Sequence, residues 1–307
     1  MRSDCHVHMV LDAVDWKGAI RRHEKGADEG LVRGVLARYR DMGYTYLRDG
    51  GDKWGVSRFA RSAAESYGIR YRTPLAPICK LGHYGGFIGE RFDSMGEYAA
   101  LVARRREQGA DFIKIMISGL MDFDRFGVLT EPGLDAGEIR EMIHIAHEEG
   151  FAVMAHANGA DTVKAAARAG VDSVEHGAYL DNDALHAMTE AGTVWVPTLS
   201  TIGNLRDGRD GSFDSLRSLR MTEGRTMTEG AAGRHRRYCQ AAVEAILESA
   251  LENVAAFAQM GGLIAPGTDA GAWAVPHGCS TEAALLEQAG VTAEQLEMGT
   301  ARVIEKF

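Results

Sequence analysis

The sequence predicts a single-domain (β/α)8 barrel over residues 1–307. Short apolar runs recur along the chain, and segments with helical periodicity separate them, as expected for repeated strand–helix units around a parallel sheet. We expect eight strands, near residues 4–8, 44–48, 70–77, 111–118, 151–156, 172–176, 194–199 and 262–267. Eight such units fit a closed barrel better than the alternative, an open doubly wound sheet.

The segments between the expected strands have the pattern of amphipathic helices. The clearest examples cover residues 31–43, 97–109, 136–150 and 160–170, and each ends in glycine. Glycine at that place favours the left-handed conformation that commonly ends a helix.

Length, charge and cysteine spacing restrict the class of protein. A chain of 307 residues can bury roughly three quarters of its unfolded surface around one core. The net charge of −9 argues against a nucleic-acid partner, and no apolar run is long enough for a membrane span. The N-terminus lacks an apolar signal region, and the four cysteines form no C-x-x-C pair. We therefore expect a cytoplasmic protein with structural thiols.

One long polar segment interrupts the regular order of strands and helices. Residues 203–237 are rich in glycine and arginine and lie between the seventh and eighth expected strands. A segment of this length inside a compact domain is usually functional or disordered. It could form a lid over the barrel mouth or a surface insertion.

The first expected strand carries two histidines separated by one residue. Because alternate side chains of a strand face the same way, His6 and His8 are expected to point into the barrel while Val7 faces the helices. Two imidazoles at this spacing can bind one divalent ion. Asp4 shares their parity and could orient a histidine from behind.

Lys114 lies in the middle of the apolar run FIKIMIS, where a charged ammonium is costly to bury. One interpretation is a buried salt bridge. The other is a lysine whose lowered pKa lets its amine take up carbon dioxide, so that the resulting anionic carbamate bridges two metals.

Three further metal-binding side chains end expected strands. His156 and His176 end two consecutive strands, and Asp269 follows the last one in GTDAG. Each has an ordinary alternative, a core histidine or a helix cap. Strands of a barrel deliver their last inward side chains to one mouth, so the six residues together predict a two-metal hydrolytic centre.

These motifs, D-x-H-x-H, the mid-strand lysine, AHANG, VEHGAYLD and PGTDAGAWAVPHG, resemble the amidohydrolase superfamily over residues 4–305. The nearest branch contains imidazolonepropionase-like and Xaa-Pro dipeptidase-like members. The resemblance implies that His6, His8 and Asp269 hold one metal and that His156 and His176 hold the second. It also implies that N6-carboxylated Lys114 bridges two divalent ions, with zinc favoured by ligand type and manganese possible.

The sequence departs from this resemblance in two ways. Family members usually carry a small β-sandwich, whereas this chain starts three residues before the motif and ends at ARVIEKF. We therefore expect a barrel without the sandwich, whose exposed bottom a second copy would cover in a homo-oligomer. Dipeptidase-like relatives tend to have a tyrosine where this chain has Asn158, which argues against a classical peptidase.

Other side chains are expected around the metals. The resemblance implies that His83 donates a hydrogen bond to the substrate carbonyl, as an oxyanion-stabilising catalytic group. Arg48 and Asp49 are expected to pair near the barrel mouth. The expected substrate contacts are Tyr84, Arg125, Asn158 and His277.

The predicted enzyme hydrolyses a C–N bond of an amide, cyclic amide or peptide-like small molecule. A water that bridges the metals would become the nucleophile, and Asp269 would carry its proton to the leaving nitrogen. Lactone, ester and organophosphate hydrolysis are compatible with the same centre. A mononuclear deaminase fits less well, because Lys114 is present and no H-x-x-E follows the fifth strand. A non-catalytic barrel scaffold would be expected to have lost ligands.

Overall fold

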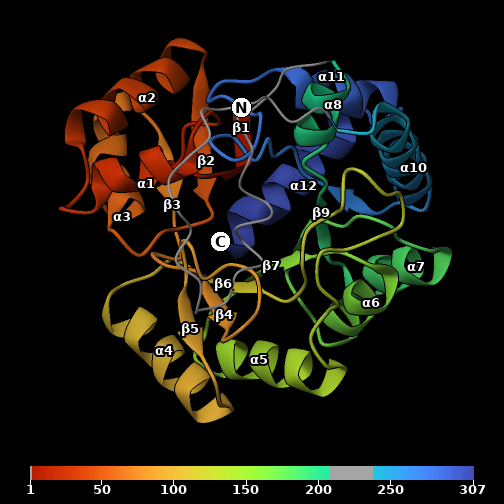
Figure 1. Cartoon of the computed structure of the whole chain (residues 1–307), viewed down its shortest axis with the longest axis horizontal. Coiled ribbons are helices and arrows are strands. Elements are labelled where there is room, and N and C mark those ends of the chain that lie inside the picture. Colours follow the sequence, from red (N-terminus) through yellow and green to blue (C-terminus); the bar gives the residue numbers. More distant parts are fainter. Residues whose placement is uncertain (1, 208–237) are drawn as a thin grey trace, which may run out of the picture.

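A computed structural model describes residues 2–207 and 238–307 of the chain, with parallel strands at the centre and helices around them (Figure 1). The strands are β1 Arg2–Val7, β2 Tyr44–Asp49, β3 Arg70–Arg72, β4 Ile78–Lys80, β5 Glu90–Phe92, β6 Ile113–Met116, β7 Val153–Ala157, β8 Ser173–His176, β9 Val194–Val196 and β10 Leu263–Ile264. The α-helices are α1 Trp16–His23, α2 Glu29–Asp41, α3 Val56–Ala64, α4 Met95–Glu107, α5 Ala136–Glu148, α6 Ala160–Arg168, α7 Asn182–Ala191, α8 Ser200–Arg206, α10 Gln240–Gln259, α11 Thr281–Gln288 and α12 Ala293–Lys306.

The predicted α/β class with parallel strands is confirmed. The strands form two sheets, with the orders β1-β2-β3 and β10-β9-β8-β7-β6-β4-β5, and every pairing between named strands is parallel. Helices ring these strands in Figure 1. In the described part of the chain, no helix is long and apolar enough to cross a membrane.

The expected closed ladder of eight strands is not formed by the described residues. The predicted strand 70–77 is divided into β3 and β4, because Pro74 and Pro77 lie between them and proline cannot donate to a ladder. Backbone hydrogen bonds cross both seams between the sheets. Beside β1, Cys5 N donates to Pro266 O at 2.8 Å, Asp269 N to His6 O at 2.8 Å and His8 N to Ala270 O at 2.7 Å. At the other seam, Asp111 N donates to Thr73 O at 3.0 Å.

The helices begin and end where local chemistry favours it. Asp28 and Ser94 accept hydrogen bonds from the first turns of α2 and α4, and Thr292 forms a capping box with Gln295 at the start of α12. The four helices expected from the sequence correspond to α2, α4, α5 and α6. Of the predicted lid 203–237, residues up to Arg206 belong to α8, and 208–237 lie outside the described residues.

The last helix covers the end of the barrel at which the strands begin. Val303 and Phe307 are buried in an apolar cluster with Phe112, which directly precedes β6. The Phe307 ring lies 5.2 Å from that of Phe112, and the Arg48 guanidinium lies 4.4 Å from the Phe307 ring centre. The C-terminus accordingly lies near the middle of the ring in Figure 1. The chain thus covers part of the surface that was expected to need a second copy.

Candidate metal centre

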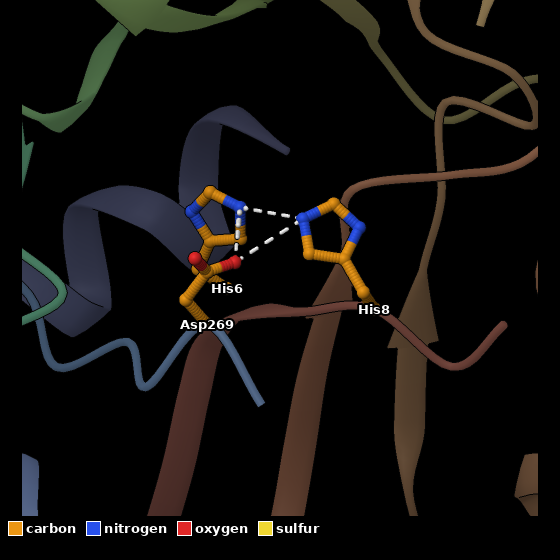
Figure 2. Close-up of side chains that lie close together, drawn as sticks. All are labelled: His6, His8 and Asp269. Atoms are coloured by element: carbon orange, nitrogen blue, oxygen red, sulfur yellow. Dashed lines mark hydrogen bonds and ion pairs between the residues drawn. The ribbon is translucent and has the colours of Figure 1, made fainter. Parts of the chain in front are cut away.

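Three predicted ligands converge at the end of β1. Figure 2 shows the imidazoles of His6 and His8 and the carboxylate of Asp269 facing one another. The two Nε2 atoms are 3.3 Å apart, and Asp269 Oδ1 lies 3.2 Å from the Nε2 of His8 and 3.5 Å from that of His6. All three residues are buried.

This donor set fits a divalent cation. Burial lowers the pKa of His6 well below its usual value, so its imidazole is neutral and one ring nitrogen carries a lone pair. Nitrogen lone pairs and a carboxylate oxygen at such separations repel one another unless a proton or a cation lies between them. One carboxylate and two imidazoles are also a common ligand set for zinc. Among the described residues, this is the one group of three or more histidine, cysteine, aspartate or glutamate side chains whose ligand atoms all lie within 4.8 Å of one another.

Lys114 projects from β6 toward the same centre. Its Nζ lies 3.4 Å from His6 Nε2, and its side chain is buried. Burial lowers the pKa of Lys114 to about 8, although the charges of Glu175 and Asp269 act in the opposite direction. No described carboxylate lies within ion-pair distance of the amine, so the alternative of a buried salt bridge is not observed.

The second pair of histidines lies beside the first. The ring centres of His156 and His176 are 4.6 Å apart, and that of His176 is 5.1 Å from His6. Burial lowers the pKa of both, to about 3 for His156, which leaves them neutral as metal ligands must be. His176 Nδ1 lies 2.7 Å from Thr198 Oγ1, and His156 Nε2 lies 3.2 Å from the carbonyl oxygen of Gly119.

The backbone at two of these strand ends is unusual. His176 and Asp269 have φ angles of +67° and +61°, in the left-handed region that non-glycine residues rarely adopt. Such a conformation costs on the order of 1–3 kcal/mol and tends to occur at functional sites. At His176 the Trp195 indole supports it, because Nε1 donates a 3.0 Å hydrogen bond to the His176 carbonyl.

The sequence reasoning missed Glu175. Glu175, the residue of β8 before His176, is fully buried, and its Oε2 lies 2.7 Å from His6 Nδ1. Arg48 was expected to pair with Asp49, but it donates instead to Glu175 Oε1 at 2.8 Å, to Ser173 Oγ and to the Cys5 carbonyl. A glutamate inside an apolar strand needs a partner for the same reason as Lys114, and this signal could have identified it.

Asp4 supports the centre through the backbone. It does not contact a histidine ring: its carboxylate accepts hydrogen bonds from the backbone N–H of His6 and from the N–H and hydroxyl of Thr268, next to Asp269. The register of β1 shifts between Asp4 and Val7, so strict alternation does not extend through the strand. Burial raises the pKa of Asp4 to about 6.

The candidate metal centre opens into one pocket. Five of the six predicted ligands line it, together with Tyr84 and Asn158 from the expected substrate contacts. Its remaining walls are mainly apolar and include Trp16, Phe87, Met116, Met121, Phe123 and Trp273. Asn158 holds the rim through bonds to the carbonyl of Gly119 and the N–H of Ala178.

The other expected side chains do not line this pocket. His83 is partly exposed, with Nδ1 3.7 Å from Glu131 Oε2. Arg125 is exposed and pairs with Asp122 at 2.6 Å. His277 is buried, with Nε2 3.1 Å from the Leu11 carbonyl oxygen, and burial lowers its pKa to about 4. The roles assigned to these three residues stay predictions.

The sequence is similar to that of amidohydrolases. The model of the amidohydrolase family matches residues 4–300. An uncharacterised protein of Mycobacterium tuberculosis is 28% identical over 277 residues, covering 87% of this chain and 65% of that protein. Ochratoxinase of Aspergillus niger is 27% identical over 230 residues, covering 65% of this chain and 47% of that enzyme. The chain therefore spans less than two thirds of the length of these relatives.

Solved structures share the fold. The crystal structure of A. niger ochratoxinase has a TM-score of 0.74 at 20% identity and covers 98% of this chain and 70% of its own. A Xaa-Pro dipeptidase with methionine bound in its active site has a TM-score of 0.71 at 23% identity and covers 99% of this chain and 74% of its own.

Proposed function

The chain belongs to the amidohydrolase family, and we propose that it hydrolyses a C–N bond of an amide, cyclic amide or peptide-like small molecule with two divalent metal ions. The observation that carries this proposal is that the six predicted metal ligands lie together, five of them lining one pocket and His6 directly beside them. In this proposal His6, His8 and Asp269 hold one ion and His156 and His176 hold the other. Zinc is the expected metal, with manganese as the alternative.

Lys114 would hold both ions as an N6-carboxylated side chain. Its lowered pKa leaves a fraction of the amine neutral near pH 7, and only the neutral amine can attack carbon dioxide. The attack forms an N–C bond, and the amine loses a proton to solvent. The anionic product would replace a buried cation by a group that metals bind.

Asp269 would move the proton. When bound, the two ions would lower the pKa of a water molecule and polarise the carbonyl of the substrate. Asp269 Oδ1 lies 3.5 Å from His6 Nε2 and 3.2 Å from His8 Nε2, beside the atoms that would hold one of the ions. Its carboxylate would take the proton from water and return it to the leaving nitrogen, a role that typically contributes about 10²–10⁴-fold in rate.

The pocket walls favour an apolar substrate group. The aromatic side chains of Trp16, Phe87, Phe123 and Trp273 line it, and no arginine and no lysine other than Lys114 lines it in the part of the chain that the structure describes. A large apolar group would gain roughly 25 cal/mol for each Å² removed from water there. The relatives named ochratoxinase and Xaa-Pro dipeptidase support amide hydrolysis as the reaction class.

Metal analysis and a substrate panel test the proposal. Protein purified without chelator should contain about two divalent ions per chain, by ligand type zinc or manganese. The panel would combine N-acyl amino acids and aromatic amides with lactone and phosphotriester probes. Replacing His8 by alanine should remove metal and turnover, whereas His144→Ala, at an exposed site on α5, should change neither. Full activity with less than about one ion per chain would exclude the binuclear proposal.

We propose that the protein is cytoplasmic and forms a homo-oligomer. The thiols of Cys5, Cys79, Cys239 and Cys279 are free, which is consistent with the proposed cytoplasmic location. A homo-oligomer stays a prediction, and light scattering at several concentrations would measure it.

A further inference from the structure

A buried chain of three side chains leads from the middle of the barrel to the candidate metal centre. Glu175 Oε2 and His6 Nδ1 lie 2.7 Å apart, as an ion-pair contact, and neither atom has a hydrogen-bond partner elsewhere among the described residues. Glu175 Oε1 accepts hydrogen bonds from Arg48 Nη2 at 2.8 Å and Ser173 Oγ at 2.6 Å. The side chains of His6, Arg48 and Glu175 are each 0% exposed. Taking both charges of the ion pair out of water is costly.

Glu175 reaches His6 because the alternation of β8 is broken at its end. Successive strand residues normally face opposite sides, so Glu175 and His176 should not both point inward. The positive φ of His176 turns its ring back toward His6 and His156 while Glu175 stays inside the barrel. His176 therefore lies beside the rings of His6 and His156, and its neighbour Glu175 lies next to Nδ1 of His6.

We propose that Glu175 is a positioning residue that keeps the His6 proton on Nδ1, so that the Nε2 lone pair faces His8 and Asp269 and is available to a metal ion. Arg48 supplies the opposite charge and fixes the direction of the carboxylate. The proposal rests on the proposed function, because it requires a metal at His6, His8 and Asp269. Carboxylates behind a ligating histidine commonly set its tautomer, and their loss typically costs about 10–100-fold in metal affinity.

Glu175→Gln tests the tautomer with little change of shape. Arg48 and Ser173 both donate to Oε1, so the amide oxygen of glutamine takes that place and its NH₂ group faces His6 Nδ1. Nδ1 must then accept, the proton moves to Nε2, and the lone pair is lost to the metal. Zinc affinity, measured by competition with a chromophoric chelator, should fall about 10–100-fold.

Cobalt substitution gives a second readout that does not depend on turnover. The visible bands of protein-bound Co²⁺ should change in Glu175→Gln at the site that includes His6. Glu282→Gln is the matched control, because Glu282 is another buried glutamate, on α11, that bonds Ser200 and does not line the metal pocket. Its zinc affinity and cobalt spectrum should equal those of the unmodified protein.

Glu175→Asp covers the case in which the glutamine variant does not fold. The shorter carboxylate keeps a charge for Arg48 but withdraws from His6, and the same loss of zinc affinity is expected. If either folded variant binds two zinc ions as tightly as the unmodified protein, the positioning role is overturned while the metal centre stands. If the unmodified protein itself binds no zinc, the proposed function fails first.

Discussion

Replacing Glu282 by glutamine should remove a large part of the pH dependence of the free energy of unfolding. The Glu282 carboxyl is 2% exposed, and its Oε2 accepts hydrogen bonds from the N–H and hydroxyl of Ser200. Its Oε1 has no hydrogen-bond partner among the described residues. Burial therefore raises the pKa of Glu282 from 4.5 to about 8.

The sign of the effect follows from the proton count. Between about pH 4.5 and about pH 8 the folded state holds the Glu282 proton while the unfolded chain has released it. Raising the pH in this interval favours the unfolded chain. The contribution of Glu282 to the free energy of unfolding is therefore fully present below pH 4.5 and declines until about pH 8. From these two pKa values, the free energy of unfolding is expected to fall by about 3 kcal/mol between about pH 5.5 and about pH 8.5.

Denaturant unfolding at the two pH values measures this difference. Because glutamine cannot titrate, the free energy of unfolding of Glu282→Gln should fall by about 3 kcal/mol less over this interval than that of the unmodified protein. Any constant cost of the buried amide cancels, because each variant is compared with itself. Glu287→Gln, an exposed position on the same helix, should behave like the unmodified protein. Equal pH dependence in the Glu282→Gln and unmodified proteins would refute the reasoning.

Three further predictions concern the metal centre. Lys114→Met should lose at least one metal ion, and short carboxylic acids should partly restore turnover to Lys114→Ala; a Lys114→Met variant with both ions and normal turnover would contradict the bridge. Asp269→Asn should lower kcat by about 10²–10⁴-fold while metal analysis still finds bound ions, and near-normal turnover would place the proton shuttle elsewhere. His83→Ala should leave metal content unchanged and cost about 10²–10³-fold in kcat, whereas a change below about threefold would mark His83 as a surface residue beside Glu131.

Much of the fold could be predicted from periodicity. Apolar runs and helix-ending glycines located helices α2, α4, α5 and α6 and most strands, because these signals are local. The division between β3 and β4 could also have been predicted, since Pro74 and Pro77 are visible in the sequence. The position of Phe307 beneath the barrel depends on contacts with Arg48 and Phe112, and no local signal indicates them.

The candidate site was predicted less evenly. His6, His8 and Asp269 converge as expected, because strand ends of a barrel share one mouth. Glu175 was missed because alternation places it outside when His176 is inside, and the φ angle that breaks this rule is a tertiary feature. His83 lies in a loop whose conformation depends on partners such as Glu131, which spacing along the chain does not indicate.

The contact between Phe307 and Arg48 has a consequence for the order of synthesis. Arg48 contacts Glu175, which in turn contacts His6, so a candidate ligand early in the sequence is supported through the ring of Phe307. While a ribosome is still adding α12, this support cannot be complete, however early β1 and β2 have paired. Arg48 then lacks the Phe307 ring, the nearer of its two aromatic neighbours, and a metal ion that arrived during translation would meet a site that is only partly supported. We therefore expect the candidate metal centre to be fully supported only after α12 has packed against Arg48.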